Sequence, residues 1–345
     1  MKKYTILFLF LVSFTVFSNI RTYGKGPLFS KNVFSPYIIF MNLPGQKALI
    51  DSPRSLNITT SIYYSQDFNI YAIYNYPHEE WGIFRVADFE SFILESSSFY
   101  SINKYFEIGM SIRLISYYGG ALDSFTQYWH DLFSLPNGGR EYFPINEVYV
   151  DFKTQNGFDI FLDKPAVGFG DIDTWFKFNF YTNKYSAFSL TQGFKIPTGQ
   201  LSNITGSGYP DYLAGLLIDF YPIQYFSMYL QGAAVFPLQF MFPDAPTPYP
   251  SFNAIVSLEF SPVKFFSIIT QMNIKTSHIK GYIPIYNNLG MYTELAGSPQ
   301  TNLLVGIVFT IDRYRLQIYF EEDTFMNAGT DYTVSVALSY DLRLK

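Results

Sequence analysis

The adjacent residues His130 and Asp131, which follow Trp129, are residue types from which an enzyme could build a catalytic group. A histidine can take the proton of a serine hydroxyl, as in lipid-hydrolysing enzymes, while an aspartate orients the histidine. The sequence contains no GxSxG motif or other nucleophile signature. We therefore favour a structural role, in which the pair holds a loop against the rest of the fold through hydrogen bonds.

Two carboxylates, Asp171 and Asp173, stand one residue apart and therefore face the same side of a strand. Such a pair could perform acid–base chemistry or bind Ca²⁺. We expect it instead to be matched by Lys177 or Lys195 on the inner side of the fold. The chain has 3 histidines and 0 cysteines, so neither a transition-metal site nor any cofactor is predicted.

The composition indicates a protein whose outer surface meets lipid. The 345 residues include 37 Phe and 30 Tyr, and only 15% of them are charged. The absence of cysteine excludes disulfides, a cysteine nucleophile and a lipoprotein anchor. The net charge of −5 leaves no basic footprint for nucleic acid, which is therefore not an expected partner.

The first 18 residues have the pattern of a secretory signal peptide. Lys2 and Lys3 precede an apolar run over residues 6–17, which is shorter than the ~20 residues that a spanning helix needs. We expect cleavage after Ser18. Residues 19–54 are irregular and interrupted by prolines, so they are predicted to form a periplasmic arm or a plug.

The elements that must position these side chains alternate apolar and polar residues, with a period of two, from residue 55 onward. In the last segment the apolar face consists of Val334, Val336, Leu338, Tyr340, Leu342 and Leu344. Runs of this length exceed the usual ~5–6 residues of a strand and match the ~9–11 residues that cross a bilayer. Because open sheet edges cannot exist in hydrocarbon, such strands must close into a barrel with its apolar face toward lipid.

The connections between these segments are alternately short and long, which is typical of periplasmic turns and external loops. The fold predicted for residues 55–345 is an all-β transmembrane antiparallel β-barrel of about 12 strands. The strands are expected over residues 55–65, 86–99, 104–116, 171–181, 185–196, 211–221, 225–236, 251–261, 264–275, 302–311, 313–321 and 332–344. Residues 68–76 and a hairpin over 147–162 are ambiguous, and the count becomes 14 if the hairpin spans.

One stretch, residues 117–140, does not alternate. Its apolar residues recur at steps of three and four, which predicts a short amphipathic helix in a long external loop. We expect this helix to be the plug of a narrow barrel. The candidate lumen and plug residues are Arg113, Trp129, His130, Asp131, Arg140, Asp171, Asp173 and Lys195.

Several short motifs identify a resemblance to a known family. They are Gly26-Pro27-Leu28 with Asn32 and Pro36, Asp88-Phe89-Glu90, Gly119-Gly120-x-Leu122-Asp123, the run from His130 to Arg140, Gly168-Phe169-Gly170-Asp171, Lys195-Ile196-Pro197-Thr198-Gly199, Gly206-Ser207-Gly208, and Glu322-Asp323 with Asp331. With these residues the chain resembles the uncharacterised Gram-negative outer-membrane family known as domain of unknown function thirty-one eighty-seven. The resemblance implies a β-barrel and leaves its activity open.

These observations favour a passive channel or uptake porin for small amphipathic solutes in the Gram-negative outer membrane. The expected partners are outer-membrane lipid, lipopolysaccharide and the barrel-assembly machinery. Two alternatives stay open: a membrane-embedded lipid-modifying enzyme that uses His130, and a structural or biogenesis barrel without a ligand.

Overall fold

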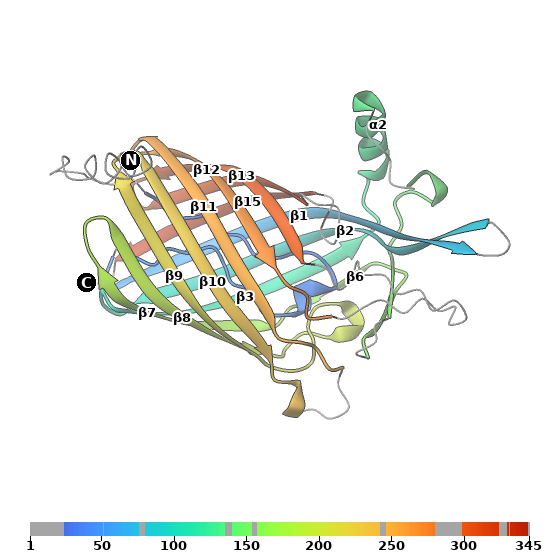
Figure 1. Ribbon diagram of the computed structural model, residues 1–345, viewed down its shortest axis with the longest axis horizontal. Coiled ribbons are helices and arrows are strands. Elements are labelled where there is room, and N and C mark those ends of the chain that lie inside the picture. The colour runs from blue at the N-terminus through green and yellow to red at the C-terminus, as the bar shows by residue number, and fades with distance from the viewer. Residues whose placement is uncertain are drawn as a thin grey trace, which may run out of the picture.

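The computed structural model describes residues 24–50, 52–75, 80–134, 140–153, 157–241, 246–279, 299–323, 330 and 332–343. The predicted signal peptide, residues 1–18, lies outside this part of the chain. Twelve long strands form a closed antiparallel barrel, because β1 pairs with β2 on one side and with the last strand, β15, on the other (Figure 1). The barrel strands are β1 (Ser55–Asn75), β2 (Glu80–Ser101), β3 (Phe106–Tyr118), β7 (Ile172–Thr182), β8 (Ser186–Ile196), β9 (Asp211–Ile223), β10 (Phe226–Pro237), β11 (Ser251–Val263), β12 (Phe266–Lys275), β13 (Gln300–Ile311), β14 (Tyr314–Asp323) and β15 (Tyr332–Arg343).

The alternating pattern separates the two faces of the wall as the sequence predicts. In β15, Val334 and Leu338 are 42% and 49% exposed, whereas Ser335 between them is 1% exposed. Exposed side chains of this kind point away from the barrel and form its apolar outer face. In β15 the side chains with the opposite parity are small or polar and point into the lumen, whereas inward residues of other strands, such as Leu213, Ile269 and Leu304, are apolar and buried. This separation of the two faces confirms the predicted transmembrane barrel fold.

The two ambiguous segments do not add spanning strands. Residues 68–75 continue β1, which pairs with β2 as a long ribbon beyond the barrel (Figure 1). The predicted hairpin forms β4 (Tyr149–Lys153) and β5 (Asp159–Leu162), and β4 joins the barrel through only two residues of β2. The short strand β6 (Ala166–Phe169) pairs with the end of β3 and leads into β7. The barrel therefore has twelve strands.

The two ends of the barrel differ in their connections. At one end, here called the short-turn end, tight turns join β2 to β3, β7 to β8, β9 to β10, β11 to β12 and β13 to β14. The opposite, long-loop end carries helix α2 (Asp123–Phe133) and the single 3₁₀ turns η2 (Arg140–Tyr142), η3 (Leu201–Asn203) and η4 (Gln239–Met241). Helix α2 forms where the 3.6-residue pattern predicts it and stands away from the barrel wall (Figure 1). No helix in the described part of the chain is long and apolar enough to cross a membrane.

Residues 24–50, here called the arm, run inside the barrel and are mostly buried. The arm starts at the short-turn end, where Gly24 lies against Ser227 and Tyr229 of β10. It reaches the long-loop end at the turn η1 (Tyr37–Ile39), and then returns to the short-turn end, where β1 begins. The principal hydrophobic core thus lies between the arm and the barrel wall, and it includes Leu28, Phe34, Ile38 and Phe40.

Candidate functional site in the barrel lumen

The arm has almost no regular secondary structure, so its backbone N–H and C=O groups need partners other than each other. A buried backbone group without a hydrogen bond costs free energy comparable to a lost bond. The inward polar side chains of the wall supply these partners. The polar face of the strands therefore binds a peptide segment of the same chain.

The outgoing limb, residues 24–35, is held by side chains of β10, β11, β12 and β14. The amide of Gly26 donates to the hydroxyl of Tyr229 at 3.0 Å, and the amide of Leu28 donates to Gln271 Oε1 at 3.0 Å. The amides of Lys25 and Phe29 donate to the side chains of Glu259 and Gln317. Tyr319 and Gln271 donate back to carbonyls of the same limb.

The returning limb, residues 40–50, is held by the other side of the wall. The amide of Met41 donates to the carboxylate of Asp211 at 2.8 Å. The amides of Ala48 and Leu49 both donate to Asp219 at 2.9 Å. The arm is not part of a sheet, so these amides cannot bond to a neighbouring strand, and the two carboxylates accept them instead. Asp211 and Asp219 therefore act as anchors for the arm.

Lys31 of the arm is the centre of a first buried charge cluster. Its ammonium lies 2.9 Å from Glu95 and 3.1 Å from Asp173, and it donates to the hydroxyl of Ser111 at 2.8 Å. Arg113 approaches Asp173 at 3.9 Å and donates to the carbonyl of Ile38. The predicted lumen residues Arg113 and Asp173 thus lie inside the barrel, and both contact the arm.

Lys195 is the centre of a second buried charge cluster. Its ammonium lies 3.1 Å from Asp171 and 2.9 Å from Asp211, and all three side chains are almost inaccessible to solvent. It also donates to the carbonyl of Ile39 and to the hydroxyl of Ser207, both at 2.6 Å. The cluster ties the tip of the arm to β8, β9 and the loop that joins them.

Asp171 has a second role, which explains two of the glycine motifs. Its carboxylate accepts the amides of Gly199 and Ser207 and so closes the loop between β8 and β9. A Cβ at Gly206 would lie 2.7 Å from the Cα of Gly199 and would also collide with the Asp171 carboxylate. Glycine is required here by the close approach of the two loop segments.

Helix α2 contributes nothing to the lumen in the described part of the chain. Trp129 is 46% exposed and packs against Phe125 and Phe133 of the same helix. The predicted plug is therefore corrected: the segment inside the barrel is the arm, and the helix projects beyond it. An amphipathic helix satisfies its own backbone, so it does not need the polar wall.

The base of α2 is nevertheless fixed to the barrel through other predicted residues. Glu90 of β2 accepts the amides of Ala121 and Leu122, at 2.9 and 2.6 Å. Asp123 accepts a hydrogen bond from Gln66 at 2.6 Å and lies 3.6 Å from Arg140. The Arg140 guanidinium also lies over the ring of Phe68, at 4.4 Å. Arg140 is thus buried beside the loop base rather than in the lumen.

His130 and Asp131 lie in the last turn of α2. Their carbonyls accept the amide of Ser134, which caps the helix in a left-handed conformation with φ of 56°. Among the described residues, Nδ1 of His130 has no hydrogen-bond partner, and no serine is paired with this ring. The described part of the chain therefore places no nucleophile beside His130, and the catalytic interpretation has no structural support.

A serine–histidine contact that the sequence did not indicate lies elsewhere, at the tip of the arm. Nδ1 of His278 donates to the carbonyl of Tyr249 at 2.8 Å, so Nε2 accepts from the hydroxyl of Ser251 at 2.7 Å. The ring of Phe40 stacks on His278 at 4.2 Å, and both Ser251 and His278 are 0% exposed. Burial lowers the pKa of His278, and the nearby charge of Lys275 lowers it further. The ring is therefore neutral, and it holds the tip of the arm through its stacking on Phe40.

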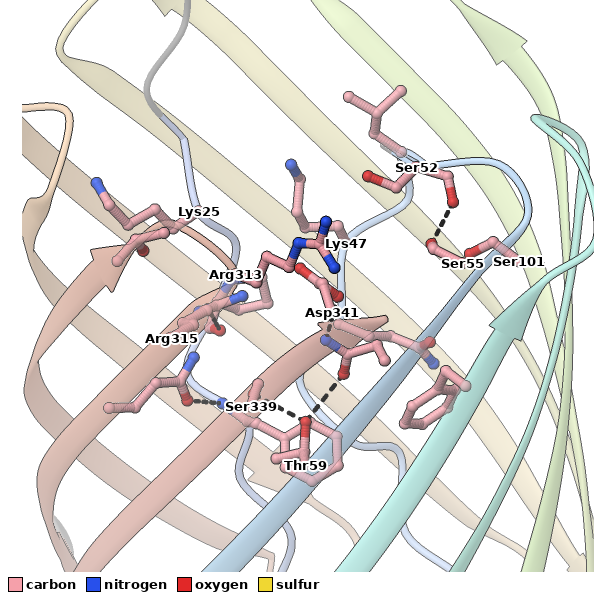
Figure 2. A pocket seen from close by; sticks show the side chains of 18 of the residues that line it. Lys25, Lys47, Ser52, Ser55, Thr59, Ser101, Arg313, Arg315, Ser339 and Asp341 are labelled. Atoms are coloured by element: carbon pink, nitrogen blue, oxygen red, sulfur yellow. Dashed lines mark hydrogen bonds between the residues drawn. The ribbon is translucent and has the colours of Figure 1, made fainter. Parts of the chain in front are cut away.

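Two cavities lie between the arm and the wall, with volumes of about 330 Å³ and 30 Å³. The larger one lies at the short-turn end between the two limbs of the arm and strands β1, β14 and β15 (Figure 2). The smaller one lies deeper, between the arm and strands β11 to β14. Of these two cavities in the described part of the chain, the larger therefore lies toward the short-turn end.

Solved structures similar to this barrel include an outer-membrane channel, a porin and a transporter. The crystal structure of the COG4313 outer membrane channel from Pseudomonas putida F1 has a TM-score of 0.57 and 11% identity, over 87% of this chain and 100% of that chain. The NanC porin has a TM-score of 0.44 and 5% identity, over 83% and 98% of the two chains. The Pseudomonas putida toluene transporter TodX has a TM-score of 0.37 and 9% identity, over 92% and 99%.

The first of these similarities supports the barrel fold and, at this identity, the fold alone. No curated protein matches the sequence. A model of one protein family matches residues 6–219, which is more than half of the chain and contains the arm, α2 and both buried charge clusters. The chain therefore belongs to the family described as protein of unknown function, DUF3187.

Proposed function

We propose that this protein is a passive outer-membrane channel for small polar or amphipathic solutes, and that its N-terminal arm keeps it closed. The observation that carries the proposal is the course of the arm. Both of its limbs leave the barrel at the short-turn end, so the arm can be withdrawn without threading the chain through the wall. The COG4313 outer membrane channel, which shares the barrel fold, is a channel, and our proposal extends that role to this chain.

Contacts between the two limbs make a shortened arm feasible. The amide of Gly45 donates to the carbonyl of Ser30 at 3.3 Å, so the limbs are already adjacent below the tip. Replacing residues 31–44 with two glycines would remove the tip and leave both ends of the arm in place. The wall would keep its closed ladder of strand hydrogen bonds.

The test is conductance in planar lipid bilayers. We expect the shortened-arm protein to conduct continuously and the full chain to open rarely. The matched control lacks residues 124–133 of α2 and should behave as the full chain, because the helix lies outside the lumen. Heat-modifiable migration on gels verifies that each variant forms a barrel. Equal conductance of the full chain and the shortened-arm protein would refute the proposal.

The apolar outer face supports outer-membrane lipid as the surroundings of the barrel. We further propose that the short turns face the periplasm, which would place α2 and the β1–β2 ribbon outside the cell, beside lipopolysaccharide. Assembly of such a barrel would use the barrel-assembly machinery. Protease digestion of intact cells tests the orientation, since cleavage should occur in α2 and spare the short turns.

A further inference from the structure

The cavity at the short-turn end has the size of a small-molecule site. Its volume of about 330 Å³ falls at the lower end of the ~300–1,000 Å³ typical of ligand pockets. Both limbs of the arm contribute to it, through Lys25 and Lys47, and the wall contributes side chains of β1, β2, β3, β14 and β15. A solute bound there would touch the arm and the wall at once.

Positive charge predominates around this cavity. Five basic side chains line it, namely Lys25, Lys47, Lys177, Arg313 and Arg315, against the three acidic side chains Glu107, Asp312 and Asp341. Glu107 is occupied by Lys177, at 2.6 Å. Asp341 accepts a hydrogen bond from Asn57 at 2.6 Å. Lys25, Lys47, Arg313 and Arg315 lie on one side of the cavity (Figure 2), where the ammonium of Lys25 donates to the hydroxyl of Ser267 and that of Lys47 to the carbonyl of Gly24.

The surroundings of Lys25 show how close these cations are. Burial lowers the pKa of Lys25, Glu259 opposes that change, and the like charges of Arg315 and Lys47 lower the pKa further. Arg315 also donates to the carbonyls of Gly26 and Pro27 in the arm. An anion between these groups would relieve the repulsion and connect the wall to the arm.

The uncharged part of the lining includes several hydroxyl groups and a few rings. The hydroxyls belong to Ser52, Ser55, Thr59, Ser101, Thr310, Tyr314 and Ser339. Thr59 and Ser339 bond to each other at 2.8 Å, and both can exchange hydrogen bonds with a hydroxylated solute. Phe29 and Phe99, in edge contact at 6.2 Å, add an apolar side to the cavity.

From these features we infer that the short-turn cavity is a binding site for a small hydroxylated oxyanion, a carboxylate or a phosphate, held by Arg313, Arg315 and the two arm lysines. Guanidinium groups match the geometry of both oxyanions. The inference deepens the proposed channel function by naming the class of solute.

The experiment is isothermal titration calorimetry of the full chain in detergent at low ionic strength. Gluconate and glucose 6-phosphate are the charged probes, and glucose is the neutral control. We expect the charged probes to bind and glucose to show at least about tenfold weaker binding, because the charge-assisted hydrogen bonds are lost. Binding of gluconate alone, or of the phosphate alone, supports the site and assigns the oxyanion. Equal binding of glucose overturns it.

Variants locate the site. Arg313 is exposed, so Arg313→Gln should weaken binding about tenfold without loss of fold, and Arg313→Lys should restore part of it. Lys104→Gln removes a cation at the same end but outside the cavity, and binding should stay within about twofold of the full chain. Equal effects of Arg313→Gln and Lys104→Gln overturn the assignment. Calorimetry requires no flux, so a channel that fails to conduct leaves this test unaffected.

Discussion

The arm and helix α2 are the two segments that depart from the alternating strands, and they occupy opposite environments. The arm is irregular and rich in proline, yet it is buried in the lumen, where Leu28, Ile38 and Phe40 are each 0% exposed. The helix has the more conspicuous amphipathic pattern, yet Phe125 and Leu132 on its apolar face are 55% and 59% exposed. The strength of a periodic pattern therefore did not indicate which segment fills the barrel.

The difference lies in where the backbone finds its hydrogen bonds. A helix satisfies its interior N–H and C=O groups by itself and can project into solvent. An irregular segment buried in a barrel must bond to side chains of the wall. The lumen of this protein is therefore polar because it binds a peptide, and its polarity alone does not imply a water-filled pore.

The largest expected effect comes from removing the cation that ties the arm tip to the wall. Lys195→Ala leaves Asp171 and Asp211 buried and without their shared partner. We expect the free energy of unfolding to fall by about 3–5 kcal/mol, as when one member of a buried ion pair is removed. Urea unfolding in detergent, followed by tryptophan fluorescence, measures it. Lys184→Ala, in the exposed turn between β7 and β8, should change the value by less than about 0.5 kcal/mol. A similar loss in both variants would contradict the anchoring role.

A smaller effect is expected from a neutral anchor. Gln271→Ala removes the acceptor of the Leu28 amide and the donor to the hydroxyl of Ser30. We expect a loss of about 1–3 kcal/mol, the cost of leaving buried polar groups unsatisfied. The matched control is Thr270→Ala, because this neighbour points outward. If the two variants unfold at the same urea concentration, the wall does not hold the arm through its inward side chains.

Acid should weaken the arm tip through His278. The folded protein keeps this ring neutral, since burial lowers its pKa, whereas the unfolded chain takes up a proton near the ordinary value of 6.5. The unfolded state therefore binds more protons below pH 6.5, and stability falls as the pH falls. The expected slope from this group is at most about 1.4 kcal/mol per pH unit. Unfolding between pH 8 and pH 5 measures it, and His278→Gln should reduce the slope relative to the full chain. An unchanged slope in this variant would contradict the buried neutral ring.

The smallest effect is expected on the helix. Trp129→Ala should change the free energy of unfolding by less than about 0.5 kcal/mol and leave conductance unchanged, because its ring is 46% exposed and packs on Phe125 and Phe133 of the same helix. Phe40→Ala in the arm, by contrast, should cost about 3–5 kcal/mol. A large effect of Trp129→Ala would show that the helix enters the lumen and would remove the contrast between the two segments.

The strands were predictable because a wall with lipid on one side imposes a period of two. The predicted strand over residues 211–221 is observed as Asp211–Ile223, and the predicted helix lies within residues 117–140. The extension of β1 to Asn75 was not predicted, since a ribbon beyond the barrel has no lipid face to impose that period. A hairpin does form within residues 147–162, as β4 and β5. The turn motif that predicts a hairpin is the same whether or not the hairpin spans the membrane.

The occupant of the lumen could not be deduced from the wall. Inward residues such as Gln271, Asp211 and Asp219 have the same sequence pattern whether they bind water or a peptide. A signal did exist in the arm itself. The run from Tyr37 to Met41 contains five consecutive apolar residues outside any strand, and these must be buried somewhere. Lys31, the partner of Asp173, lies 142 positions away in the sequence, so spacing alone could not pair them.

The course of the arm also bears on how the protein folds. Side chains of many barrel strands anchor the arm, so its full set of contacts requires those strands to be in place. The outer ends of both limbs lie at the short-turn end, so the arm can enter a barrel that is already complete. Docking of the arm can then follow closure of the barrel, and the polar wall can stay hydrated until the arm is in place. A barrel lined with apolar side chains would instead collapse or aggregate while it waited for its plug.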